Sequence, residues 1–248
     1  MIRATNLLVP AFAAAIFAVT PPCAYADPDD SLLTTYSQYG SRLIDIGYGT
    51  QKVPGQFPAS AATFGVGDGI EEYWYSEFYL SYTHDSGGAT TFDSAALQNI
   101  FDLTRGALPV DIGLYTEIEY ERDRTQGYQA SFGPLFQTEF GLTTANLNFL
   151  LQRNYRADAY NAMQLGYQWQ IKERISASYE FGVQGFGELG QWNHWAPRDQ
   201  QEHRLGPVIL GKLALDDGRV IHYNVALLFD AFDRQNALTL RAQAVIGF

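Results

Sequence analysis

Apolar side chains occupy every second position in the last twelve residues of the chain. Thr239, Arg241 and Gln243 fall between the apolar positions. The apolar set is Leu238, Leu240, Ala242, Ala244, Ile246 and Phe248. Side chains of a β-strand point in turn to its two faces, so this segment has one apolar face and one polar face. The pattern therefore predicts a strand that separates an apolar environment from a polar one.

The same period of two recurs along the whole chain and predicts twelve strands. They cover 41–50, 60–67, 70–83, 91–104, 110–121, 126–140, 143–154, 159–172, 175–188, 203–214, 219–230 and 237–248. The strand at 60–67 has the weakest pattern. Residues 94–105 could instead form a short helix, because Ala95, Ala96, Leu97 and Gln98 are good helix formers. The even spacing of the apolar residues there favours a strand.

The links between these segments alternate in length. Tight turns are expected at 68–69, 105–108, 141–142, 173–174 and 216–218, and longer links lie between them. Lipid offers no hydrogen-bond partner to the backbone, so strands can cross a membrane only in a closed barrel. We therefore expect an all-β fold, a single antiparallel transmembrane β-barrel of about twelve strands over 41–248. A final strand that ends on an aromatic residue is typical of bacterial outer-membrane barrels.

The beginning of the chain has the pattern of an export signal. Arg3 is followed by an apolar stretch over 7–19 and by small residues at Ala24 and Ala26. The apolar stretch is shorter than the roughly 20 residues that a spanning helix needs. We expect residues 1–26 to be a cleaved signal peptide and residues 27–40 to form a short periplasmic segment. Cys23 precedes the expected cleavage point, so the mature protein would contain no cysteine.

The polar faces of the predicted strands carry more acidic than basic residues. The candidate lumen-lining residues are Glu77, Glu117, Glu119, Glu139, Glu180, Arg204, His222 and Arg241. These faces predict either an aqueous pathway that prefers cations or neutral polar solutes, or a polar core that fills a narrow barrel. The net charge of −11 argues against a nucleic-acid partner.

The segment 187–207 contains two tryptophans and two of the four histidines. Its candidate functional residues are Trp192, His194, Trp195 and His203. A histidine beside Asp199 or Glu202 could act as a general base or a metal ligand, but the segment contains no serine or threonine and no short metal-ligand spacing. We favour an aromatic girdle at the membrane interface, and we predict no catalytic residue, metal or cofactor.

Four segments resemble a group of proteobacterial outer-membrane barrel proteins that is loosely similar to the phenol-degradation MetA-pathway barrels. They are 110–117, 145–148, 187–190 and 201–207. The resemblance implies an outer-membrane barrel and solute passage, and it supplies no catalytic residues. The expected partners are outer-membrane lipid and lipopolysaccharide, the barrel-assembly machinery through the last strand, and a small solute.

The sequence thus favours a narrow channel or uptake barrel for small polar or cationic solutes in the bacterial outer membrane. Two other functions stay open at this point. One is a membrane-embedded lipid hydrolase that uses His203. The other is a structural or adhesive barrel whose extracellular loop 191–200 binds a partner.

Overall fold

A computed structural model describes residues 30–35, 40, 42–84, 88–216, 218–232 and 237–248. The signal peptide predicted over 1–26 lies outside these residues. The long strands are β1 (Arg42–Lys52), β2 (Ala59–Glu71), β3 (Trp74–His84), β4 (Thr91–Asp102), β5 (Asp111–Glu121), β6 (Tyr128–Phe140), β7 (Thr143–Tyr155), β8 (Gln164–Arg174), β9 (Tyr179–Gln191), β11 (Glu202–Ala214), β12 (Val220–Asp230) and β13 (Leu238–Gly247). A two-residue strand, β10 (His194–Trp195), and two 3-10 helices, η1 (Arg124–Gln126) and η2 (Arg198–Gln200), lie in the links. None of the helices in the described part of the chain is long and apolar enough to cross a membrane.

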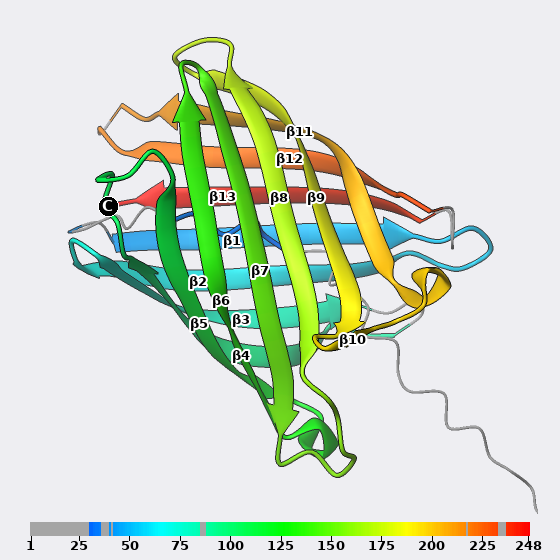
Figure 1. Ribbon diagram of the computed structural model, residues 1–248. Helices are drawn as coiled ribbons and strands as arrows, with labels where there is room; N and C mark the ends of the chain where they lie inside the picture. Colours follow the sequence, from blue (N-terminus) through cyan, green and yellow to red (C-terminus); the bar gives the residue numbers. More distant parts are fainter. Residues whose placement is uncertain (1–29, 36–39, 41, 85–87, 217, 233–236) are drawn as a thin grey trace, which may run out of the picture.

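The twelve long strands form one antiparallel sheet that closes on itself (Figure 1). Each strand pairs with its neighbours in the chain, and β9 pairs with both β8 and β11. The first strand closes the barrel against the last one, from Leu43 opposite Gly247 to Lys52 opposite Leu238. Closure gives each long strand two neighbours, so the backbone needs no hydrogen bond from lipid. The predicted twelve-stranded antiparallel barrel is confirmed.

The barrel turns its apolar side chains outward and its polar side chains inward. On β5, Ile118 is 60% exposed, whereas the adjacent Glu117 is only 7% exposed. On β13, Leu238 and Leu240 are exposed, and Arg241 is 2% exposed. In a water-soluble protein this arrangement would leave a large apolar surface in water. An apolar belt around a closed barrel instead matches the hydrocarbon layer of a membrane.

The strand ends define two ends of the barrel. We call the end where β1 begins and β13 ends the terminal end, and the opposite end the loop end. The links β2–β3 and β6–β7 at the terminal end have two residues each, at 72–73 and 141–142. The link β4–β5, also at the terminal end, is longer than predicted and covers 103–110. The link from β9 to β11 at the loop end contains both β10 and η2.

The structure extends or moves several predicted elements. The weakest predicted strand, 60–67, exists and continues to Glu71, and residues 94–105 contain strand rather than helix up to Asp102. The expected turn at 68–69 is wrong, because the chain turns at 72–73. Gly67 lies just before the expected turn, and a Cβ at this position would overlap the Tyr75 ring and hydroxyl. Glycine at this position lets the Tyr75 side chain lie against the strand.

Candidate functional site in the barrel lumen

One side of the inner wall carries carboxylates whose hydrogen-bond donors are uncharged. Glu77 on β3 accepts hydrogen bonds from the Tyr75 hydroxyl at 3.0 Å and from Gln98 Nε2 at 2.6 Å. Glu117 on β5 accepts one from the Tyr79 hydroxyl. Phenols and amides hold these carboxylates in place without neutralising them. This part of the wall therefore attracts cations when the carboxylates are ionised.

Two further carboxylates on the inner wall also have uncharged hydrogen-bond donors. Glu119 on β5 accepts a hydrogen bond from Gln129 Nε2 at 3.1 Å. Asp45 on β1 accepts one from Gln243 Nε2 at 2.6 Å. Together with Glu77 and Glu117 they lie on β1, β3 and β5, and we call these four residues the acidic wall.

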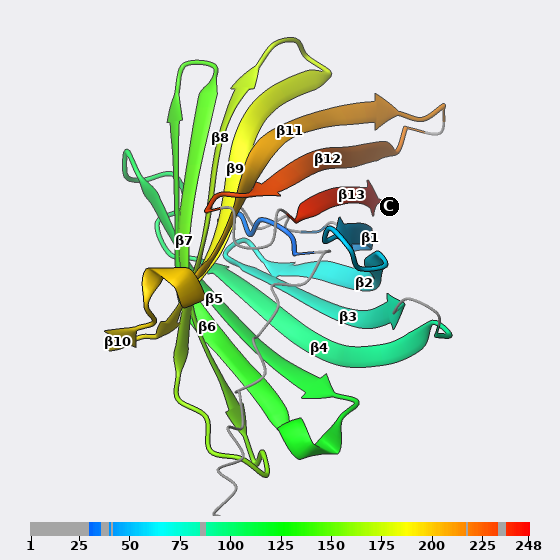
Figure 2. The same ribbon diagram turned by 90° about the vertical axis from the view of Figure 1, so that its right-hand side faces the viewer.

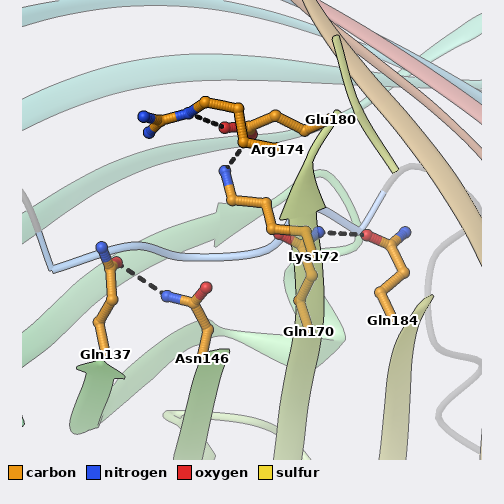
Figure 3. Close-up of polar contacts among 7 residues, drawn as sticks. All are labelled: Gln137, Asn146, Gln170, Lys172, Arg174, Glu180 and Gln184. Carbon is orange, nitrogen blue, oxygen red and sulfur yellow. Dashed lines mark hydrogen bonds and ion pairs between the residues drawn. The ribbon is translucent and has the colours of Figure 1, made fainter. Parts of the chain in front are cut away.

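The wall formed by β6 to β9 is a polar network with mixed charge (Figure 3). Asn146 Nδ2 donates to Gln137 Oε1 at 2.8 Å, and Gln170 Nε2 donates to Gln184 Oε1 at 3.0 Å. Nearer the terminal end, Glu180 accepts from Lys172 Nζ at 2.6 Å and forms an ion pair with Arg174 at 3.6 Å. Glu180 therefore has basic hydrogen-bond and ion-pair partners, whereas the hydrogen-bond donors of the acidic wall are uncharged.

The segment Asp30–Thr35 lies inside the barrel, where Figure 2 shows it in blue between opposite walls. The Leu33 N–H donates to Gln168 Oε1 at 3.1 Å, and the Leu33 carbonyl accepts from Asn148 Nδ2 at 2.9 Å. The Thr35 hydroxyl donates to Gln137 Oε1 at 3.4 Å. These contacts satisfy polar groups of a segment that lies outside the sheet. Residues 30–35 of the segment predicted over 27–40 thus lie within the lumen.

Leu33 also anchors an apolar cluster inside the barrel. The buried members of the cluster are Leu33, Leu43, Tyr75, Ile100, Tyr115 and Leu135. The other five lie on the inner wall in the half of the barrel nearer the terminal end, and Leu33 of the N-terminal segment packs against them. Burial of a leucine side chain contributes about 1.5–3 kcal/mol, so Leu33 helps to hold the segment in place.

At its other end, the segment meets two arginines. Asp30 Oδ2 lies 3.2 Å from Arg204 Nη2 on β11. The Asp30 carbonyl oxygen accepts a hydrogen bond from Arg241 Nη1 on β13. Arg204 and Arg241 are 5% and 2% exposed. The segment therefore runs along the lumen from this arginine pair near the loop end to Gln137 towards the terminal end.

The structure separates the predicted lumen residues by depth. Glu77, Glu117, Arg204 and Arg241 are buried, and Glu119 and Glu180 are partly buried. Glu139 and His222 are exposed. They lie on the inward-facing side of β6 and β12, but close to the terminal end of each strand. Sequence alternation predicts the face of a strand but not how far a residue lies from the opening.

The predicted loop residues do not converge on a catalytic or metal site. Trp192, His194 and Trp195 are exposed. His203 Nδ1 lies 2.6 Å from the Tyr167 hydroxyl and Nε2 lies 3.0 Å from Gln201 Oε1, and the ring packs edge-on against Phe232. Both ring nitrogens are therefore engaged in holding the loop to the wall. Among the residues that the structure describes, no group of three His, Cys, Asp or Glu side chains could hold a metal ion.

Sequence reasoning missed the N-terminal segment as part of the lumen. The pair Leu32-Leu33 is the local signal that could have indicated it, since two leucines interrupt an otherwise polar stretch. That pair of leucines does not by itself indicate that the segment lies inside the barrel or that it contacts Asn148 and Gln168.

No family model and no curated protein matches the chain. Solved structures match its fold. The NanC porin superposes with a TM-score of 0.59 at 8% identity, over 83% of this chain and 98% of the porin. The KdgM porin gives 0.55 at 8% identity, over 82% and 99%. The COG4313 outer membrane channel from Pseudomonas putida F1 gives 0.59 at 9% identity, over 90% and 99%.

At such low identity, this likeness establishes the fold. The chain is an outer-membrane type β-barrel. Its closed sheet and apolar outer belt place the protein in the bacterial outer membrane, in contact with lipid.

Proposed function

We propose that the protein is a narrow outer-membrane channel for small polar solutes, with a preference for cations. The observation that carries the proposal is the acidic wall, in which four carboxylates have uncharged hydrogen-bond donors. A barrel of twelve strands is narrow, so a permeating ion passes close to these groups. Rings or rows of carboxylates favour cations in channels. The resemblance of the fold to small porins supports the same proposal.

The segment Asp30–Thr35 sets the conductance in this proposal. It occupies the lumen beside the acidic wall and is held by hydrogen bonds, one ion pair and one buried leucine. A solute passes when the segment moves aside. The protein that contains the segment therefore conducts weakly, because the segment blocks the lumen most of the time.

Conductance and ion selectivity in planar bilayers test the proposal. We expect the refolded protein to give a cation-selective current, and Glu77→Gln with Glu117→Gln to lower the cation-to-anion permeability ratio roughly twofold. Glutamine keeps the size of each side chain and removes its charge. The matched control is Glu139→Gln, which removes one exposed carboxylate at the terminal end and should leave the ratio nearly unchanged.

Two results would contradict the channel. One is a correctly folded barrel that carries no current even without its N-terminal segment. The other is a current whose selectivity ignores both substitutions in the acidic wall. Heat-modifiable migration in gel electrophoresis verifies the fold of each variant.

The finer assignments belong to the same proposal. The likeness to the phenol-degradation MetA-pathway barrels, the identity of the solute and recognition of β13 by the barrel-assembly machinery stay predictions. We favour the channel over the lipid hydrolase, because both ring nitrogens of His203 are engaged by Tyr167 and Gln201.

A further inference from the structure

We propose that Arg204 and Arg241 form a carboxylate-binding site in the lumen, and that Asp30 occupies it as an internal ligand. The site takes small solutes that carry a carboxylate and a second oxygen acceptor. Such solutes enter a cation-preferring lumen most readily when they also carry a positive group. This inference deepens the proposed channel function and rests on it for its biological use. The binding site itself can be measured without any current.

The geometry of Asp30 defines the ligand. Its side-chain carboxylate lies beside Arg204, and its main-chain carbonyl oxygen accepts a hydrogen bond from Arg241. The carboxylate carbon and the carbonyl carbon of an aspartate are separated by two atoms, Cβ and Cα. A solute with the same spacing can place one oxygen on each arginine.

The surroundings fix the Arg241 guanidinium and shield the pair. Arg241 Nη2 also donates to Asn224 Oδ1 at 2.8 Å, and its guanidinium lies 5.6 Å from the centre of the Phe186 ring. Part of the wall beside the pair is apolar, with Phe186, Val208 and Leu228 all buried. Both arginines are themselves almost fully buried, and burial strengthens the attraction between an arginine and a carboxylate. The site is therefore arranged before a solute arrives.

Exchange of a solute for the Asp30 carboxylate links solute binding to opening of the lumen. Asp30 is part of the same segment as Leu33 and Thr35, which cover the apolar cluster and contact Gln137. A solute that takes the place of the Asp30 carboxylate removes the ion pair that holds one end of the segment. The solute that the channel carries thereby favours displacement of the segment.

Binding of N-acetylglycinate tests the site, because its carboxylate and amide carbonyl have the spacing of the two Asp30 groups. We expect Asp30→Ala protein to bind it about tenfold more tightly than wild-type protein in calorimetric titration. N-acetylglycinamide has the same shape without the charge and should not bind measurably. In the Asp30→Ala background, Arg204→Gln should weaken binding about tenfold.

Equal affinity for N-acetylglycinate and N-acetylglycinamide would overturn the site. So would an affinity for N-acetylglycinate that Arg204→Gln leaves unchanged. If Arg204→Gln does not fold, Arg241→Lys keeps the charge but loses the planar guanidinium, and it should still weaken binding. The two proposals can fail separately. A silent barrel that binds N-acetylglycinate refutes the channel alone, and a conducting barrel whose binding ignores both arginines refutes this site alone.

Discussion

In planar bilayers, a protein that begins at residue 36 should carry roughly ten times the current of the protein that begins at residue 27. The deletion removes every described residue of the segment that contacts Arg204, Gln168 and Gln137 inside the barrel. All twelve long strands begin after it, so their pairing is retained. The lost Leu33 exposes part of the apolar cluster, and we expect a small decrease in stability with an intact barrel.

A reversible lock provides the matched experiment. A Cβ on Gly113 would lie 3.3 Å from Thr35 Cγ2, so cysteines at these two positions are near enough to form a disulfide. The chain has no cysteine after Cys23, so Thr35→Cys with Gly113→Cys introduces a single pair. The oxidised form should be silent, and a reductant should restore the wild-type current. Thr35→Cys alone should conduct like the wild type in both states, and equal current before and after reduction of the pair would show that the segment does not obstruct the pathway.

The second large effect concerns the outer surface. Ile209→Arg should destabilise the barrel by about 2–4 kcal/mol in lipid vesicles, because an arginine in the middle of a strand meets the centre of the bilayer. Ile209 lies in the middle of β11 and is 50% exposed on the outer face. Equilibrium unfolding by guanidinium in vesicles measures the change in free energy.

Leu213→Arg is the control on the same strand and the same face. Leu213 has nearly the same exposure, but it lies one residue from the end of β11. We expect a cost of about 0–1 kcal/mol there, since an arginine near the interface reaches water. Equal small costs at both positions would mean that this face meets water rather than lipid.

The local periodicity of the sequence predicted most of the fold. Alternation on β5 and β13 predicted which face of each strand is apolar, because a period of two is a property of the strand itself. Even the weak segment 60–67 forms a strand as predicted. Closure also followed, since unpaired strand edges cannot exist in lipid.

Three things could be seen only in the tertiary structure: how deep a residue lies in the barrel, which side chains approach a strand closely, and which distant segments of the chain meet. Asp68 and Gly69 indicated a turn, but β2 continues to Glu71, and the Tyr75 side chain from the next strand explains the glycine at 67. Glu117 and Glu139 have the same inward-facing pattern, and only strand length and register place the first inside and the second at the opening.

The sequence by itself determined the class of fold, the apolar outer belt and the polar, acidic inner face. The tertiary structure alone decided that Asp30–Thr35 occupies the lumen and that Asp30 meets Arg204. The physical reason is distance along the chain, because the contact between Leu33 and Gln168 joins residues 135 positions apart. No local pattern encodes such a contact.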